Sequence, residues 1–143
     1  MVSVERSITV DRPAEEVLRY LADFGHTPEW DPGTESCVRV DDGPVVRGSR
    51  WINVSRFRGR RTRLTYRLER YEDDRLVFVG ENRTVTATDD ITVRAWDGRT
   101  VVVYQAHLRF KGLARLAAPF LRPAFEGLAD GVAEQLPRVL RTR

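Results

Sequence analysis

Two neighbouring carboxylates, Asp89 and Asp90, stand inside the stretch "TATDDITV". Successive residues of a β-strand point to opposite faces of the sheet, so only one of the two can face the interior. Asp89 shares its parity with Ala87 and Ile91, which predicts that Asp89 is the inward one. A buried carboxyl group has a raised pKa and can abstract a proton near neutral pH. The alternative is that a β-bulge shifts the parity, or that Asp89 lies in water at the rim of the sheet.

A second set of polar candidates lies in "SRWINVSRF", residues 49–57. Its alternation is ambiguous, because one face carries Trp51, Asn53, Ser55 and Phe57 while the other carries Arg50, Ile52, Val54 and Arg56. We expect the Trp51 face to point inward, because the opposite face would bury two arginines, and unpaired buried charges are strongly unfavourable. Asn53 and Ser55 would then be polar groups among aromatic side chains, which is how a binding pocket orients a ligand.

Aromatic residues supply most of the remaining candidates. In "RLTYRLERY", residues 63–71, Tyr66 shares the expected inward face with two leucines, and Tyr66 or Ser55 could hydrogen-bond a developing enolate. In 100–110 the apolar face carries Tyr104, and His107 points outward. The predicted ligand-binding residues are Trp30, Trp51, Asn53, Ser55, Phe57, Tyr66, Phe78, Tyr104, Phe120 and Phe125. The predicted catalytic residues are Asp89, Tyr66 and Ser55.

The other reactive side chains do not form a recognisable site. His26, in "DFGHTPEWDP", has no identifiable nucleophile beside it, and Trp30 of the same stretch is expected to cover one end of a cavity. Neither histidine has a partner at metal-ligand spacing, and Cys37 is the only cysteine, so we expect no metal and no cofactor. The five arginines of "RFRGRRTR" form a hairpin turn without interleaved aromatic residues, so we do not expect nucleic-acid binding.

The composition is that of one globular domain. The chain has 143 residues, of which 41% are hydrophobic and 31% charged, with a net charge of +3. No apolar run approaches the roughly 20 residues of a membrane span. The N-terminal "MVSVERSITV" lacks the apolar stretch of a secretory signal. We therefore expect a single domain over residues 1–143, located in the cytoplasm.

The hydrophobic pattern predicts the elements that carry these residues. A strand at 3–10 precedes a helix that Asp11 can cap and Gly25 ends, and "TPEWD" can form one further turn. The next strands are expected at 35–41, 49–57, 63–71, 75–81, 84–96 and 100–110. The turns between them are short, and Asp97-Gly98 is the clearest hairpin signal, so successive strands must run antiparallel.

A change of period at Gly112 predicts a C-terminal helix. Pro119 and Pro123 interrupt its apolar stripe, so we expect a short piece near 112–118 and a main helix from about Pro119 to the region of Pro137. A long sheet twists and curls, and this helix is the only long apolar one that could cover its concave face. A curled sheet leaves a gap against a straight helix, and we expect that gap to be a binding cavity.

The order of these elements resembles that of the START-like (SRPBCC) superfamily, and of its polyketide cyclase/dehydrase-like branch. The resemblance spans nearly the whole chain and rests on "ITVDRPAEEVLRYLAD", "PEWDPG", "GSRW", "LTYRLERYEDDRLVFVGEN", "GRTVVVYQAHLRFKG" and the C-terminal helix. It implies an α+β helix-grip (START/Bet v 1-like) fold, with a curved antiparallel sheet of about seven strands around the long helix. Members bind lipids, hormones or other hydrophobic molecules, or cyclise or dehydrate polyketides.

We therefore expect binding of a small hydrophobic or aromatic molecule, lipid- or polyketide-like, in the cavity between sheet and helix. One alternative is a polyketide cyclase, aromatase or dehydratase in which polar pocket residues transfer a proton. A second alternative is a protein-interaction domain with a vestigial pocket filled by large side chains. A polar-lined cavity with an inward Asp89 favours catalysis, and a larger apolar cavity favours carriage. An exposed edge strand or the outer face of the helix would offer a surface for a homodimer.

Overall fold

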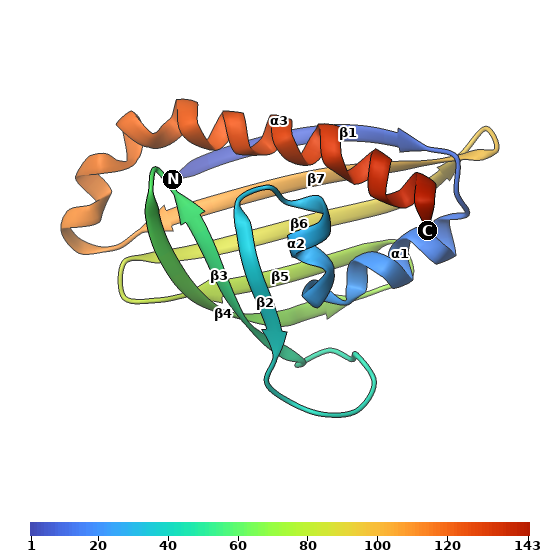
Figure 1. Ribbon diagram of the computed structural model, residues 1–143, viewed down its shortest axis with the longest axis horizontal. Helices are drawn as coiled ribbons and strands as arrows, with labels where there is room; N and C mark the ends of the chain where they lie inside the picture. The colour runs from blue at the N-terminus through green and yellow to red at the C-terminus, as the bar shows by residue number, and fades with distance from the viewer.

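One curved antiparallel sheet and a long helix laid across it make up the structure, a computed structural model of residues 1–143 (Figure 1). The seven strands are β1 Val2–Val10, β2 Thr34–Arg39, β3 Arg50–Phe57, β4 Arg60–Tyr71, β5 Arg75–Glu81, β6 Val85–Trp96 and β7 Arg99–Phe110. Their order in the sheet is β1-β7-β6-β5-β4-β3-β2. Every strand pairs with its neighbour in the antiparallel sense, so the predicted α+β helix-grip architecture is confirmed.

Five helical segments complete the fold, three after β1 and two after β7. They are α1 Ala14–Ala22, the 3₁₀ turn η1 Phe24–His26, α2 Thr27–Trp30, the 3₁₀ segment η2 Gly112–Ala117 and α3 Ala118–Thr142. The C-terminal end of α3 lies beside α1 (Figure 1), where the guanidinium of Arg143 stands 4.9 Å from the ring centre of Tyr20. The interior is therefore bounded by the sheet on one side and by α1, α2 and α3 on the other.

The first helix begins and ends differently from the prediction. Pro13, without a side-chain hydrogen bond, occupies the position before α1, so Asp11 does not cap it. The helix ends at Ala22 rather than at Gly25. The reason is Asp23, whose carboxylate accepts a hydrogen bond of 2.9 Å from the Gly25 amide and so starts the 3₁₀ turn η1 instead.

The long helix α3 continues past Pro137, so the predicted end of the helix was wrong. Pro123 and Pro137 both lie inside α3, where each removes one backbone hydrogen bond. Leu136 and Leu140 are buried on the inner face of the last turns, and this burial holds the helix together across the proline. The short piece expected near 112–118 is present as η2.

The β6–β7 hairpin keeps its register from end to end. Asp97 and Gly98 have φ angles of 50° and 75°, the left-handed pair that a two-residue hairpin turn requires. Residues of β6 from Val85 to Trp96 pair with β7 without a shift, and the β5–β6 pairing is equally regular. No bulge therefore reverses the alternation of side chains in β6.

Tightly packed aromatic side chains fill the part of the interior near α1 and α2. Phe24, from η1, stacks on Phe78 with ring centres 4.2 Å apart, and Trp51 meets Phe78 edge-on at 5.7 Å. Trp30 contacts Phe24 in the same manner at 6.5 Å. All four are almost completely buried. This end of the sheet is therefore solid core.

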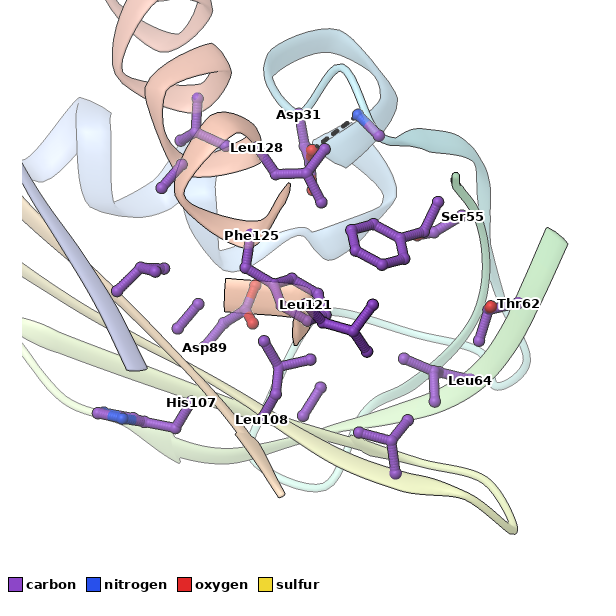
Figure 2. A pocket seen from close by; sticks show the side chains of 18 of the residues that line it. Asp31, Ser55, Thr62, Leu64, Asp89, His107, Leu108, Leu121, Phe125 and Leu128 are labelled. Carbon is purple, nitrogen blue, oxygen red and sulfur yellow. Dashed lines mark hydrogen bonds between the residues drawn. The ribbon is translucent and has the colours of Figure 1, made fainter. Parts of the chain in front are cut away.

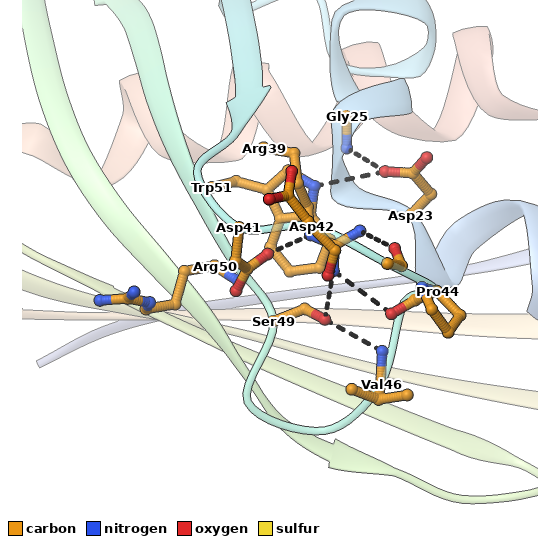
Figure 3. A network of polar contacts seen from close by, with 11 residues as sticks. Asp23, Gly25, Arg39, Asp41, Asp42, Pro44, Val46, Ser49, Arg50 and Trp51 are labelled. Carbon is orange, nitrogen blue, oxygen red and sulfur yellow. Dashed lines mark hydrogen bonds and ion pairs between the residues drawn. The ribbon is translucent and has the colours of Figure 1, made fainter.

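A polar network fixes the loop between β2 and β3 (Figure 3). The guanidinium of Arg39 lies 5.6 Å from the ring centre of Trp51, pairs with Asp41 and donates a hydrogen bond of 3.0 Å to the hydroxyl oxygen of Ser49. The same oxygen of Ser49, which is buried, accepts a bond of 3.0 Å from the amide of Val46. These hydrogen bonds order the loop, and Val45 also packs against the hydrophobic core.

Candidate functional site

A cavity of about 210 Å³ lies between the sheet and the N-terminal half of α3 (Figure 2). It is the gap that the curvature of the sheet predicts. Fifteen of its 23 lining residues are hydrophobic. The lining side chains of α3 are Leu121, Phe125, Leu128, Ala129 and Val132. Opposite them stand residues of β1, β3, β4, β6 and β7, so the hollow is enclosed by segments from both ends of the chain.

Small residues keep the cavity open, and aromatic residues wall it. Ala87 on β6, Ala106 on β7 and Ala129 on α3 line the cavity, where larger side chains would fill it. Phe125 stacks on Phe57 of β3 with ring centres 4.5 Å apart and an interplanar angle of 8°. The result is a hollow next to the solid aromatic core.

Asp89 is the buried acid of the cavity. The unbroken alternation of β6 turns Asp89 inward with Ala87 and Ile91, and the residue is only 7% exposed. Its Oδ2 accepts a hydrogen bond of 3.3 Å from the hydroxyl of Tyr104. Burial, followed by the negative charge of Asp31, raises the pKa of Asp89 to about 7, although the bond from Tyr104 acts in the opposite sense. This carboxyl group can therefore both give and take a proton near neutral pH.

Asp31 is a second carboxyl group of the cavity, and sequence reasoning missed it. It follows α2, and its two carboxylate oxygens accept hydrogen bonds of 2.9 Å from the Gly33 amide and 3.1 Å from the Thr34 hydroxyl. The first of these bonds is drawn in Figure 2. Burial raises the pKa of Asp31 in spite of these bonds. The only signal in the sequence was the turn motif Asp-Pro-Gly, which fixes a bend but not the direction of the side chain.

Tyr66 contributes a hydroxyl group without a partner in the protein. The residue lines the cavity and is 7% exposed, and its hydroxyl makes no hydrogen bond to any other group of the chain. Burial raises the pKa of Tyr66 well above its ordinary value, and the charges of Asp89 and Asp31 raise it further. The ring lies against Gly80 of β5, which has no side chain to obstruct it. A hydroxyl group left free in this way at the wall of a cavity is available to a ligand.

Ser55 and Asn53 form a pair, of which only Ser55 reaches the cavity. The hydroxyl of Ser55 donates a hydrogen bond of 2.7 Å to Oδ1 of Asn53. Asn53 is buried beside the cavity but does not line it. The proton of Ser55 is therefore engaged, and the serine can offer a ligand only the lone pairs of its oxygen.

The predicted aromatic residues divide into two groups. Phe57, Tyr66, Tyr104 and Phe125 line the cavity. Trp30, Trp51 and Phe78 belong to the solid aromatic core instead, because they share the inward face of the fold but lie nearer α1 and α2. Phe120 is 75% exposed, because it precedes the stripe Leu121, Phe125 and Leu128 that α3 turns toward the cavity.

Neither histidine directs its ring into the cavity, although His107 is one of the residues that border it. His26 stacks on Tyr20 with ring centres 4.4 Å apart, and its Nδ1 is 2.8 Å from the carbonyl oxygen of Tyr20. Nδ1 of His107 is 2.8 Å from the hydroxyl oxygen of Ser3, and Figure 2 shows the ring directed away from Asp89. No group of three or more histidine, cysteine, aspartate or glutamate side chains is arranged to hold a metal ion.

Comparison with known proteins assigns the chain to a family. The sequence profile of the family described as "Polyketide cyclase / dehydrase and lipid transport" matches residues 1–141. The chain belongs to this family. This agrees with the predicted resemblance to the START-like (SRPBCC) superfamily and its polyketide cyclase/dehydrase-like branch. No curated protein sequence matches the chain.

Solved structures of other proteins share the fold of this family member. A START superfamily protein from Mycobacterium smegmatis is 14% identical, with 99% of each chain covered and a TM-score of 0.79. The ZhuI aromatase/cyclase from Streptomyces sp. R1128 is 20% identical, with 96% of this chain and 94% of that chain covered and a TM-score of 0.70. Ara h 8.0201 is 13% identical, with coverages of 99% and 98% and a TM-score of 0.69. At these identities the likeness establishes the fold alone.

None of the helices, α3 included, is long and apolar enough to cross a membrane.

Proposed function

We propose that the protein binds a small hydrophobic or aromatic molecule in the cavity beneath α3. The observation that carries this proposal is the cavity itself, which is mostly apolar and holds a few polar groups, Asp89 and Tyr66 among them. Such a combination provides affinity through apolar burial and orientation through hydrogen bonds. The names of the family and of the ZhuI aromatase/cyclase, which refer to polyketide chemistry and lipid transport, support a ligand of this character.

The size of the cavity limits the ligand. Its volume of about 210 Å³ lies below the roughly 300–1,000 Å³ typical of pockets for drug-sized molecules. We therefore expect a ligand of one or two rings, or a short chain, rather than a long folded polyketide or a two-chain lipid. Burying roughly 200 Å² of apolar ligand surface is worth about 5 kcal/mol before ordering costs. A free energy of about 5 kcal/mol corresponds to a dissociation constant of about 0.2 mM, so we expect binding in the sub-millimolar to millimolar range.

A cavity-filling variant tests the proposal. Binding of 2-naphthol would be measured by isothermal titration calorimetry to the wild type, to Ala106→Leu and to Val103→Leu. Ala106 lines the cavity and pairs with Asp89 across the strands, whereas Val103 is on the opposite face of the same strand. We expect Ala106→Leu to weaken binding about tenfold or more and Val103→Leu to leave it as in the wild type. Equal affinities for all three proteins, or no binding to any, would contradict the proposal.

Proton transfer is a second candidate function, and two residues of the cavity favour it. Asp89 has a pKa of about 7, and Tyr66 has a free hydroxyl group facing the same cavity. In this mechanism the carboxylate of Asp89 abstracts a proton from the carbon next to a ketone, and the hydroxyl of Tyr66 donates a hydrogen bond to the enolate oxygen that develops. Cyclisation or dehydration of a polyketide-like substrate would require both steps.

Deuterium exchange tests this chemistry without knowledge of the natural substrate. The α-hydrogens of 2-tetralone would be followed by NMR in D₂O at pD 7.5, with Asp89→Asn, Tyr66→Phe and the control Asp90→Asn. Asp90 is adjacent in sequence but points outward and pairs with Arg75 at 2.7 Å. We expect Asp89→Asn to abolish the protein-dependent exchange, Tyr66→Phe to slow it about 100-fold and Asp90→Asn to retain it. Exchange by Asp89→Asn at the wild-type rate would exclude this role.

A further inference from the structure

The polar groups of the cavity are unbalanced in charge. Asp31 and Asp89 line it, and only two basic side chains border it, Arg56 and His107. Arg56 donates its Nε hydrogen to Glu35 at 2.7 Å, on the outer side of β3, and is exposed. His107 is bonded to Ser3 on the outer face of the sheet. Neither base is directed toward the two acids, so the cavity contains two carboxyl groups and no counter-ion.

We propose that the ligand of this cavity carries a protonated amine, which binds to Asp89, Asp31 and Tyr66 while the apolar part of the ligand lies beneath α3. This inference rests on the proposed binding function and adds the chemical class of the ligand.

The acceptors of the cavity match the donors of an ammonium group. An ammonium group has three N–H donors and no acceptor. The cavity offers one acceptor oxygen on each of three side chains, namely the carboxylates of Asp89 and Asp31 and the unpartnered hydroxyl of Tyr66. Hydrogen bonds between an ammonium group and a carboxylate are among the strongest in proteins. Tyr66 is only 7% exposed, and its hydroxyl would gain the partner that the protein does not provide.

Electrostatic repulsion in this buried site disfavours a negatively charged ligand. A carboxylate ligand would place a third acid beside Asp89 and Asp31, and like charges in a poorly solvated site repel strongly. An amine supplies the missing counter-ion and allows Asp89 to ionise. The inference therefore excludes fatty acids as preferred ligands and ranks an amine above an alcohol, and an alcohol above a carboxylate, on the same apolar body.

The surroundings of Asp89 assign the pH response to the two carboxyl groups of the cavity, Asp89 and Asp31, because burial raises the pKa of both. Tyr104 of β7 and Tyr66 of β4 face it with raised pKa values and remain neutral in the working range. Asp31 faces it from the segment after α2, and burial raises the pKa of the Cys37 thiol on β2, so that it too remains neutral. The side chains that α3 directs into the cavity are all apolar.

Three naphthalene ligands that differ only in the polar group test the inference. 2-(1-Naphthyl)ethylamine, 2-(1-naphthyl)ethanol and 1-naphthylacetic acid would be titrated calorimetrically into the whole chain at pH 8. We expect the amine to bind about tenfold or more tightly than the alcohol, and the acid to bind most weakly. In Asp89→Asn the ratio of amine to alcohol affinity should fall severalfold, because only Asp31 is left to carry the negative charge, whereas the outward control Asp90→Asn should retain the wild-type ratio. Asp31→Asn, which keeps an oxygen to accept the Gly33 amide, should lower the ratio as well.

The dependence on pH gives an independent measurement. Between pH 6 and pH 8 the amine should bind more tightly as Asp89 ionises, whereas the affinity of the alcohol should not change. Binding of the alcohol without any preference for the amine would overturn this inference and leave the proposed binding function in place. A preference that survives undiminished in both Asp89→Asn and Asp31→Asn would also overturn it. Failure of all three ligands to bind would overturn both proposals.

Discussion

The hydroxyl of Tyr104, on β7, donates a hydrogen bond of 3.3 Å to the carboxyl group of Asp89, on the neighbouring strand β6. This is the only side-chain hydrogen bond that Asp89 makes, and it lies on the inner face of the sheet. A single neutral donor does not compensate for the loss of solvation, so the carboxyl group retains its proton up to a pH of about 7. The stability of the protein and the chemistry of its cavity both depend on this group.

Replacement of Asp89 by asparagine should change how stability depends on pH. The pKa of Asp89 is about 7 in the folded protein against 3.8 when unperturbed. Between these values the folded state holds a proton that the unfolded state has lost, so the free energy of unfolding falls as the pH rises, by on the order of 4 kcal/mol in total. Asparagine does not titrate. Urea unfolding should therefore show Asp89→Asn gaining stability relative to the wild type between pH 5 and pH 8.

The matched control for this experiment is Asp90→Asn. This variant retains Asp89, so its free energy of unfolding should fall between pH 5 and pH 8 as that of the wild type does. If the difference in unfolding free energy between the wild type and Asp89→Asn were the same at pH 5 and at pH 8, the raised pKa would be wrong.

Truncation of two phenylalanines of α3 should have very different effects on stability and binding. Phe125 stacks on Phe57 and lines the cavity, whereas Phe120 is 75% exposed. Phe125→Ala should lower the free energy of unfolding by about 2 kcal/mol and weaken the binding of 2-naphthol about tenfold. Phe120→Ala should change stability by less than about 0.5 kcal/mol and leave binding as it is. Equal effects of the two variants in calorimetry would mean that α3 presents a different face to the cavity.

Gly80 sets the position of the Tyr66 ring. A Cβ atom at Gly80 would lie 2.7 Å from three atoms of this ring, which is closer than contact permits. Gly80→Ala should therefore displace the ring, lower the free energy of unfolding by roughly 1–3 kcal/mol and weaken ligand binding.

The control for this substitution is Gly127→Ala, on the exposed side of α3. An added Cβ there meets no atom within 4 Å, and alanine favours a helix over glycine by roughly 0.5–1 kcal/mol. Thermal unfolding should show opposite signs for the two variants. A stable Gly80→Ala protein with wild-type affinity would show that the ring of Tyr66 is not held in place by β5.

A substitution in the loop between β2 and β3 should lower the stability of the protein without changing ligand binding in the cavity. Ser49→Ala removes the oxygen that accepts bonds from Arg39 and from the Val46 amide, and it leaves these donors without that partner. The expected loss in unfolding free energy is about 1–3 kcal/mol. Because the loop does not line the cavity, the dissociation constant of 2-naphthol should remain that of the wild type. An affinity that falls in parallel with stability would indicate that the loop supports the cavity.

Most of the fold follows from local patterns in the sequence. Alternation of period two marks the strands, and short turns such as Asp97-Gly98 leave only antiparallel neighbours. The inward direction of Asp89 could be predicted because β6 has no bulge. The end of α3 could not, because the local effect of Pro137 is outweighed by the burial of Leu136 and Leu140, which is a tertiary effect.

The cavity is less accessible to sequence reasoning than the fold. The alternation of residues in β3 predicts which face of the strand points inward. It does not predict where along the strand a gap opens between the sheet and α3. Trp51 and Phe57 are therefore both predicted to point inward, although Trp51 lies in the solid core and Phe57 lines the cavity. Asp31 lies in a turn, where no periodicity gives the direction of a side chain. Asp31, Asp89 and Tyr66 lie on segments far apart in the sequence, and a single sequence does not reveal that these segments border the same cavity.

The most direct test of the central claim is a methyl-resolved NMR titration of the protein with 2-naphthol. Binding in the cavity predicts saturable shifts at the methyl groups of Leu64, Leu108 and Leu128, which line it, and none at the core residues Leu68 and Leu76. Shifts confined to the exposed leucines Leu113 and Leu116, or no saturable shift at any methyl group, would contradict the claim that this protein binds small hydrophobic molecules beneath α3.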